Sequence, residues 1–193
     1  AKARAVRSNA FNTLTTNNNG RQVAVDNGTL FLAGGTHNFV DGLHIGEDGV
    51  LKGTGKVIGA VTNDGTVAPG ASIGTLPVVG TLVMGDGATY QWEITTTSSD
   101  VLSVDGDLIF DGAATLVVTN LEPMSVPAGS TSTLFTVTGT YQAPSSWNYV
   151  LPTGWSVAFI SELTPGTVSI SLIPEPAAVL AGALVVCLAR RRR

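Results

Sequence analysis

Acidic side chains form the densest group of chemically capable residues in this chain, with Asp100, Asp105, Asp107 and Asp111 close together in the sequence. Residues 105 and 107 would face the same side of a strand, so their carboxylates could share a hard cation such as Ca²⁺, which prefers oxygen ligands. The segment equally suits a turn with both carboxylates in water, and its spacing is not that of an EF-hand loop. We therefore expect no bound metal, and we take Asp105 and Asp107 as the candidate ligands should calcium bind.

Carboxylate pairs are the next candidates, because glycoside hydrolysis needs two carboxyl groups at a defined separation across a groove. Glu93 with Asp100, and Glu47 with Asp48, are pairs of this kind. No motif in the sequence singles out either pair, so they remain candidates for a carbohydrate-active enzyme and no more than that.

Other reactive combinations are missing from the sequence. His37 and His44 are not accompanied by a third ligand at a recognisable zinc spacing. The serines lack a Gly-x-Ser-x-Gly elbow, and Gly53-Thr54-Gly55-Lys56 lacks the spacing and the following helix of a phosphate-binding loop. We expect a protein that is not an enzyme and that has no cofactor.

Aromatic residues offer a different chemistry, the binding of sugar rings. Trp147, Tyr149 and Trp155 are close enough in the sequence to form an aromatic platform for a glycan. The same side chains are equally suited to fill the core of a terminal cap. We favour the core, and we keep a glycan-binding module as an alternative.

The composition indicates that strands position all of these residues. The chain has 193 residues, of which 12% are charged and 23 are glycine, against about 25% charged residues in an average soluble domain. Long-chain helix formers are scarce before residue 173, which favours an all-β fold. The sole cysteine, Cys187, lies near the C-terminal end, so the preceding residues cannot form disulfides.

The charge distribution excludes one class of partner. Between residues 22 and 172 the only basic residues are Lys52 and Lys56, against thirteen acidic ones, which gives a net charge of −11. Nucleic-acid binding needs a basic face, and this body has none. A polysaccharide lyase, which needs a basic residue to abstract a proton, is also disfavoured.

Turn signals are frequent between residues 22 and 94, where short apolar stretches alternate with glycine-containing turns. Five dipeptides in this region tolerate the positive φ angles of tight turns. They are consistent with hairpins, but their uneven spacing fits a solenoid with three short strands in each coil better. The dipeptides are Asn27-Gly28, Asp41-Gly42, Asp48-Gly49, Asp64-Gly65 and Asp86-Gly87.

A longer motif lies within this region. Gly53-Thr54-Gly55-Lys56-Val57, followed by the run Val61-Thr62-Asn63-Asp64-Gly65-Thr66-Val67-Ala68-Pro69-Gly70-Ala71-Ser72-Ile73-Gly74-Thr75-Leu76, resembles the autotransporter-associated β-strand repeat. That resemblance implies a right-handed parallel β-helix, as in bacterial surface proteins. Val67, Ile73 and Leu76 would then stack inward, and Pro77 would mark a corner or an edge.

The rest of the body divides by composition. Residues 1–21 are polar and look like a linker or the remnant of a preceding repeat, and residues 22–94 are the β-solenoid repeats. Residues 95–172 have longer, more aromatic strands, which we interpret as terminal coils and an antiparallel cap that shields the end of the core. A small separate antiparallel sandwich is the rival interpretation.

The C-terminal segment, residues 173–193, has three distinct parts. Pro174, Glu175 and Pro176 form an exposed strap, because the prolines disfavour helix. Residues 177–189 carry no charge and would form a hydrophobic helix of about 20 Å, short of the roughly 30 Å hydrocarbon core. The last part is a basic cluster that prefers the cytoplasmic side of a membrane, namely Arg190, Arg191, Arg192 and Arg193.

This order of parts resembles the PEP-CTERM sorting tail of exported proteins in Gram-negative bacteria. The resemblance implies that an exosortase, a membrane-embedded cysteine transpeptidase-like enzyme, recognises the tail and removes it near the Pro-Glu-Pro unit. The protein would be held transiently in the inner membrane with its C-terminus cytoplasmic. It would then pass to the cell surface or to an exopolysaccharide matrix. A permanent anchor and a buried core helix are the alternatives.

Taken together, these features predict an exported structural protein of the bacterial surface or matrix. Its partners would be the exosortase, the inner membrane and exopolysaccharide, and not nucleic acid. Residues 1–20 lack an apolar segment of the length a signal peptide needs. We therefore expect either the C-terminal piece of a longer precursor or a precursor with a truncated start.

Overall fold

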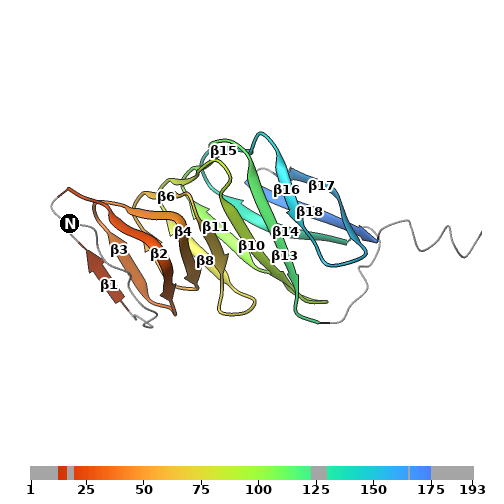
Figure 1. Cartoon of the computed structure of the whole chain (residues 1–193), viewed down its shortest axis with the longest axis horizontal. Helices are drawn as coiled ribbons and strands as arrows, with labels where there is room; N and C mark the ends of the chain where they lie inside the picture. The colour runs from red at the N-terminus through yellow and green to blue at the C-terminus, as the bar shows by residue number, and fades with distance from the viewer. Residues whose placement is uncertain (1–12, 17–19, 123–129, 165, 175–193) are drawn as a thin grey trace, which may run out of the picture.

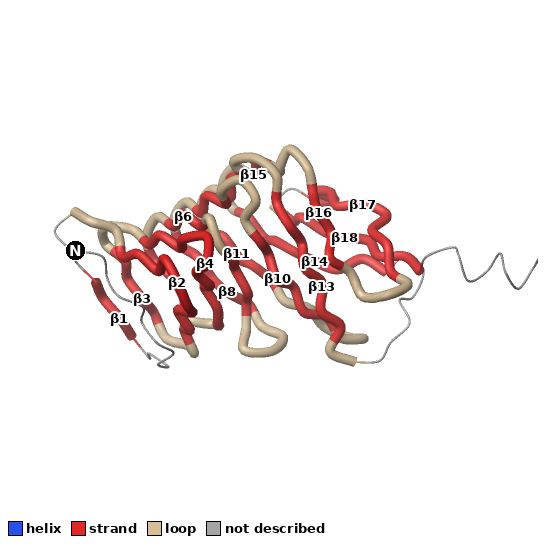
Figure 2. The backbone as a smooth tube through the Cα atoms, viewed as in Figure 1, coloured by secondary structure: helices blue, strands red, loops and turns tan. Residues whose placement is uncertain are grey.

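The computed structural model describes residues 13–16, 20–122, 130–164 and 166–174. Within these residues the chain forms eighteen strands and no helix (Figure 2). The all-β prediction is therefore confirmed for the described part. The strands are β1 (Thr13–Thr16), β2 (Val23–Leu32), β3 (Thr36–Phe39), β4 (Leu43–Gly53), β5 (Lys56–Ile58), β6 (Val61–Asn63), β7 (Thr66–Pro69), β8 (Thr75–Val79), β9 (Leu82–Met84), β10 (Thr89–Ile94), β11 (Val101–Asp105), β12 (Leu108–Phe110), β13 (Ala114–Asn120), β14 (Ser130–Val137), β15 (Tyr141–Gln142), β16 (Trp147–Val150), β17 (Trp155–Thr164) and β18 (Thr167–Pro174).

The strands form two long sheets, one of which is curled. The eight-stranded sheet has the order β1-β3-β5-β8-β11-β14-β18-β17, and the ten-stranded sheet has the order β15-β12-β9-β6-β4-β7-β10-β13-β16, with β2 paired to β4. The long strand β4 joins the halves of the second sheet, because its start pairs with β6 and its end pairs with β7. The strands of both sheets follow one another along the long axis of the molecule (Figure 1).

The chain therefore runs through three parallel ladders in a fixed order. The first ladder contains β6, β9, β12 and β15, the second contains β7, β10, β13 and β16, and the third contains β1, β3, β5, β8, β11 and β14. The long strands β2 and β4 supply both of the first two ladders. Every pairing within these ladders is parallel. We call one run through the three ladders a pass.

Equivalent residues of successive passes stack on one another. In the first ladder Leu43, Val61, Leu82, Leu108 and Tyr141 are register partners in series. The first four are at most 1% exposed. Because side chains alternate along a strand, each pass sends one set inward and the other set outward.

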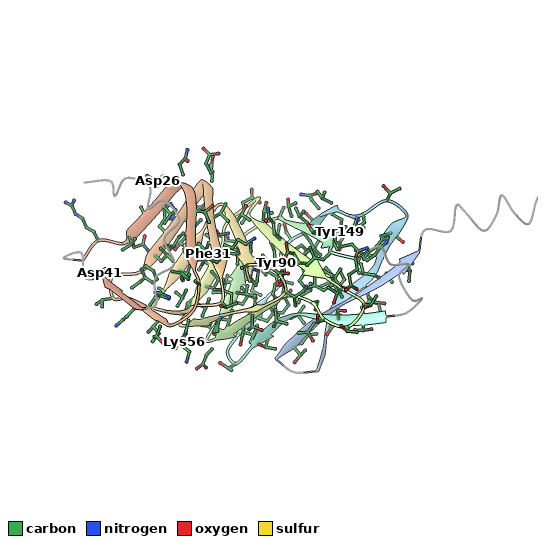
Figure 3. All side chains as sticks on the ribbon, turned by 90° about the horizontal axis from the view of Figure 1, so that it is seen from below. Asp26, Phe31, Asp41, Lys56, Tyr90 and Tyr149 are labelled. Carbon is green, nitrogen blue, oxygen red and sulfur yellow. The ribbon has the colours of Figure 1, made fainter. Side chains whose placement is uncertain are left out.

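The inward side chains form one continuous hydrophobic cluster that reaches from Val25 to Leu172. Figure 3 shows Tyr90 within the body, whereas Asp41 and Lys56 lie at its periphery. Val67 and Leu76 are fully buried, as predicted from the repeat motif. Ile73 is only half-buried, in the loop between β7 and β8, so its predicted inward stacking is wrong, because the chain leaves the ladder there.

Pro77 lies inside β8, paired with Ser103 of β11, and does not mark a corner or an edge as predicted. On its other side, the β5–β8 ladder joins Val57 to Val78 and Ile58 to Val79, beyond the proline. The pairing with β5 thus avoids the position at which proline cannot donate a hydrogen bond. A central strand tolerates Pro77 for this reason.

Glycines occupy the corners where one pass lies directly over another. Gly59, Gly80, Gly106 and Gly139 form such a series: a Cβ on each of the last three would press against the backbone carbonyl of the glycine before it. The series stands between the third ladder and the first. It makes room for the close backbone approach that stacking requires.

The five predicted turn dipeptides divide into two groups. Gly28, Gly42 and Gly87 have the positive φ angles expected of them. Gly49 and Gly65 do not; a Cβ at Gly49 would meet the carbonyl oxygen of Val25, and one at Gly65 would meet those of Gly46 and Gly49. Gly49 lies inside β4, so the turn prediction is wrong there. The chain does turn at Asp64 and Gly65, between β6 and β7, but without the positive φ angle expected of Gly65. At both positions glycine is needed because a side chain would not fit.

The C-terminal end of the body departs from parallel pairing. β14 pairs with β18, and β18 pairs with β17, both antiparallel. Beneath them the rings of Tyr90, Phe110, Phe135, Tyr141 and Trp147 contact one another, with centroids 4.9 to 6.4 Å apart. Such ring pairs add to the stability that area burial alone provides.

Two other sequence predictions concern the ends of the chain. The predicted hydrophobic C-terminal helix and most of the linker, residues 1–12 and 17–19, lie outside the described residues. In the described part of the chain, no helix of the length and apolarity needed to cross a membrane is present. Residues 95–122 continue the three ladders, since β11, β12 and β13 each pair with the strand one pass earlier.

The replacement Gly65→Ala tests the close approach at the corner. We expect it to lower the free energy of unfolding by about 2–3 kcal/mol, because the added methyl group overpacks the contact with the carbonyl oxygens of Gly46 and Gly49. The matched control is Gly87→Ala: there φ is 79° and no atom lies within 4 Å of the new Cβ, so only backbone strain of about 1 kcal/mol applies. Urea unfolding measures the loss of stability in both variants, and equal losses would contradict the close backbone contact at Gly65.

Candidate functional site

Asp100 is the one buried carboxylate among the residues that the structure describes, with 1% of its surface exposed. It lies between the end of β10 and the start of β11. Its Oδ1 accepts a hydrogen bond from the Gly74 amide at 2.8 Å, and its Oδ2 accepts one from the Glu93 amide at 2.9 Å. One side chain thus joins the loop of one pass to the strand of the next.

The backbone of Asp100 strengthens this junction. Its carbonyl oxygen accepts the indole N–H of Trp92 at 2.8 Å, and its amide donates to the Glu93 carbonyl at 2.9 Å. The local sequence allows this because Trp92 and Ile94 point inward while residues 95–99 form a loop that returns the chain to the third ladder. Trp92 is fully buried as a result.

Electrostatics at this junction is unusual for an aspartate. Burial raises the pKa of Asp100 from 3.8 to about 6, and the two amide hydrogen bonds oppose the rise only in part. The neighbouring carboxylate of Glu93 raises the pKa further, whereas the charge of Lys52 lowers it. Glu93 Oε2 is itself buried without a hydrogen-bond partner.

Glu93 and Asp100 were one of the two carboxylate pairs predicted as candidates for glycoside hydrolysis, and the structure places them side by side. A perturbed pKa beside a second acid is a pattern seen at active sites. Here, however, both oxygens of Asp100 are engaged by backbone amides and the side chain is closed off from solvent. This geometry leaves no oxygen of Asp100 that can reach a substrate.

Two other aspartates of the acidic group, Asp105 and Asp107, accept hydrogen bonds from the next pass. Asp105 Oδ1 accepts the hydroxyl of Thr138 at 2.9 Å, and Asp107 Oδ1 accepts the amide of Thr140 at 2.7 Å. They lie on either side of Gly106, at the corner between the third ladder and the first. Each therefore has a partner within the protein.

Among the described residues, no group of three or more histidine, cysteine or acidic side chains is placed to hold an ion. The candidate calcium ligands Asp105 and Asp107 instead hold a hydroxyl and an amide of the following pass. Asp86 does the same, with Oδ1 accepting the Ala113 amide at 2.8 Å.

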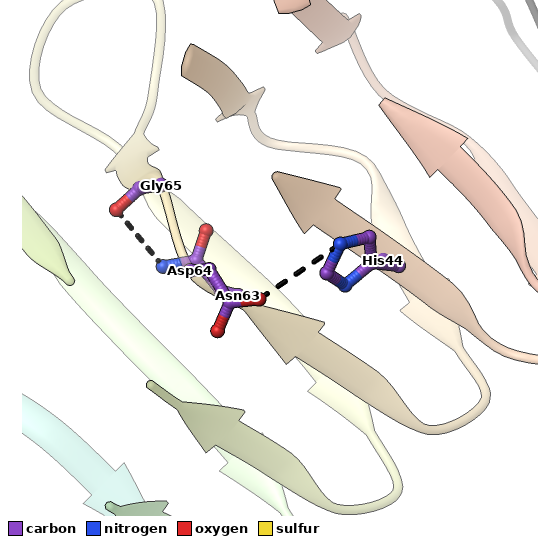
Figure 4. A network of polar contacts seen from close by, with 4 residues as sticks. All are labelled: His44, Asn63, Asp64 and Gly65. Atoms are coloured by element: carbon purple, nitrogen blue, oxygen red, sulfur yellow. Dashed lines mark hydrogen bonds and ion pairs between the residues drawn. The ribbon is translucent and has the colours of Figure 1, made fainter. Parts of the chain in front are cut away.

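The two histidines are far from equivalent. His44 faces outward on β4 and lies 3.8 Å from Asp64 Oδ2 (Figure 4). His37 is fully buried on β3, where its Nε2 lies 2.6 Å from the Gly34 carbonyl oxygen and its Nδ1 has no hydrogen-bond partner. The structure does not bring the two together.

The aromatic residues do not form a platform. Trp155 is 6% exposed, and Trp147 packs against the hydrophobic cluster, with its ring centroid 5.3 Å from that of Phe110. Tyr149 alone is exposed, at 42%. The prediction that the tryptophans serve the core is supported by these contacts.

The predicted sorting residues lie at the edge of the described chain. Pro174 is the last residue of β18 and pairs with Trp155 of β17. Glu175 and Pro176 lie outside the described residues, as does the whole basic cluster, Arg190, Arg191, Arg192 and Arg193.

Comparison of the chain with protein-family models gives no match, and comparison with curated proteins gives none either.

Sequence reasoning missed one residue in the interior of the ladders. Asn63 is fully buried between Ile45 and Met84, and its Nδ2 donates to the Gly65 carbonyl at 3.2 Å (Figure 4). The signal was available in the repeat motif, where Asn63 takes an inward position two residues after Val61.

The replacement Asp100→Asn tests the junction through its pH dependence. The pKa of Asp100 is about 6 in the folded protein and 3.8 unfolded, so the folded state binds more protons between these values. Asp100 therefore makes the free energy of unfolding fall as the pH rises from 3.8 to about 6. The free energy of unfolding of the wild type minus that of the variant should fall over this pH interval and stay constant above about pH 6.

Urea unfolding at a series of pH values measures that difference. The matched control is Asp111→Asn, an exposed aspartate of the same acidic group. A difference that rises over the same pH interval would refute the placement of Asp100 in a buried site.

Proposed function

We propose that the chain is a non-enzymatic structural protein of the bacterial exterior. Its body is a right-handed parallel β-helix, or β-solenoid, with an antiparallel cap. Residues 173–193 act as a PEP-CTERM sorting tail. The protein is held briefly in the inner membrane and then serves as a scaffold at the cell surface or in an exopolysaccharide matrix.

One observation carries the structural role: the acidic side chains connect successive passes. Asp86, Asp100, Asp105 and Asp107 each accept a hydrogen bond from the backbone or a hydroxyl group of a different pass. The bonds to Asp86, Asp105 and Asp107 are exposed and contribute little each, whereas leaving the buried carboxyl group of Asp100 without its partners would be costly. Acidic side chains that join passes in this way favour a structural role for the protein over a catalytic one.

The shape of the body supports the same role. A continuous core runs along the long axis, so bending the body would require several stacked layers to separate together. A right-handed helix is the sense that parallel crossovers adopt in nearly all proteins. An elongated, stiff body of this kind holds its ends apart, which is what a spacer needs.

The position of the tail supports sorting. Pro174 is the last residue of β18 and pairs with Trp155 of β17 in the antiparallel cap, so the Pro-Glu-Pro unit begins on a paired strand of the cap. Removal of the chain after this point would leave the paired strands of the cap in place. The arginines would hold the C-terminus on the cytoplasmic side until cleavage, because their charge resists passage through lipid.

Replacing Pro174, Glu175 and Pro176 with alanines tests the sorting role in a bacterium that has an exosortase. We expect uncleaved protein to accumulate in the inner membrane, because the residues that the exosortase is proposed to recognise are gone. Fractionation and immunoblotting with an antibody against the body measure the cleaved and uncleaved forms. Glu175→Ala alone, which leaves β18 intact, separates loss of recognition from damage to the cap.

Pro144, Ser145 and Ser146 replaced with alanines provide the matched control, since this segment lies between β15 and β16 and contains no residue of the tail. This variant should be processed normally. Normal processing of the triple alanine variant of Pro174, Glu175 and Pro176 as well would contradict the sorting proposal.

A further inference from the structure

A cavity of about 460 Å³ lies beside the junction between β10 and β11, in the part of the chain that the structure describes. Its first wall is the loop of residues 95–99 with Val101, and its second wall is residues 131–133 of β14. The volume falls in the range of small-molecule sites, about 300–1,000 Å³. None of the residues discussed above as candidate site residues lines it.

The cavity exists because two strands separate. β11 pairs with β14 only from Leu102 with Phe135 onward, whereas the earlier residues of β14 pair with β18 alone. The register between β14 and β18 shifts between Thr133 and Phe135, just where β14 gains β11 as a second partner. The gap that opens before Leu102 is the cavity.

The chemistry of the lining is uniform. Apart from Val101, every residue of both walls is a serine or a threonine, so the lining carries eight hydroxyl groups and no ionisable side chain. A hydroxyl group both donates and accepts hydrogen bonds and can rotate to suit its partner. Such a lining has no charge that would offset the charge of an ionic ligand, and it matches a neutral ligand that carries many hydroxyl groups itself.

The loop wall is held in shape from within and from β13. Thr95 and Ser98 close a turn, with the Ser98 amide 3.1 Å from Thr95 Oγ1 and the Thr95 amide 2.8 Å from the Ser98 carbonyl oxygen. Glu122, beyond the end of β13, accepts both the amide and the hydroxyl of Thr96, at 3.2 and 3.0 Å. A wall fixed in this way loses less entropy when a ligand binds.

We propose that this hydroxyl-lined cavity binds a segment of a neutral polysaccharide. The hydroxyl groups of the two walls pair with those of the sugar, directly or through water, and Val101 contacts the apolar face of a ring. In the absence of an aromatic platform the affinity is low, with a dissociation constant on the order of 1 mM. Many copies along a matrix would add their binding through avidity.

The site depends on the cavity and not on the sorting role, which determines only where the protein would meet its saccharide. The two proposals can therefore fail separately. If the purified chain binds saccharide but is not processed in cells, the binding-site proposal stands and the sorting proposal fails. If the chain is processed in cells but does not bind saccharide, only the sorting proposal stands.

Backbone amide NMR of the full, ¹⁵N-labelled chain, in a detergent without a sugar head group, tests the site. The probes are isomaltopentaose and cellotetraose, both neutral, and trigalacturonate, which is anionic, each to about 10 mM. We expect saturable shifts with at least one neutral probe, centred on residues 95–99 and 131–133. Trigalacturonate should give none at these residues.

Substitutions in the two walls test whether the lining hydroxyl groups contribute to binding. Thr97→Val with Thr133→Val removes one hydroxyl group from each wall at nearly constant volume and should weaken binding about tenfold. Thr66→Val, on the outward face of β7, is the matched control and should leave binding unchanged. The amide spectrum of each variant also reports whether the fold is retained.

Three results would overturn the site: no saturable shift with either neutral probe, preferential binding of trigalacturonate, or neutral binding that the double variant leaves unchanged while its spectrum remains native.

Discussion

Successive passes of this chain must lie one strand spacing apart, about 4.8 Å, and the rest of the structure follows from that distance. Each inward side chain is covered by the equivalent side chain of the neighbouring pass, as Leu82 is by Val61 and Leu108. At the corners the backbone itself makes the contact, and a Cβ does not fit. Gly65, Gly80 and Gly106 occupy such places because a carbonyl oxygen of the previous pass lies against them.

The same constraint explains how the acidic residues are used. Where the chain leaves a ladder, backbone amides lose their strand partners, and buried amides must find others. Asp100 supplies acceptors for two such amides, those of Gly74 and Glu93, and Asp107 supplies one for the exposed amide of Thr140. The cost is a carboxylate closed off from water, and the raised pKa of Asp100 reflects that cost.

Local sequence signals predicted the strands and much of the core, but not the reason for each small or polar residue. The repeat motif correctly indicated that Val67 and Leu76 are buried, because alternation along a strand is a local property. Gly49, Gly65 and Pro77 were misjudged because their roles depend on residues of other passes. For the same reason, no sequence pattern could single out Asp100, whose partner Gly74 lies 26 residues away.

The account is tested most directly by a disulfide across two passes. Thr89 of β10 and Thr115 of β13 are outward-facing register partners, and strands one spacing apart place Cα atoms within the range that a disulfide spans. With Cys187→Ser, the pair Thr89→Cys and Thr115→Cys should oxidise readily. Thr89→Cys with Thr119→Cys, on the same face but four residues further along β13, should not. Equal oxidation of both pairs, or of the second pair alone, would contradict the stacked arrangement.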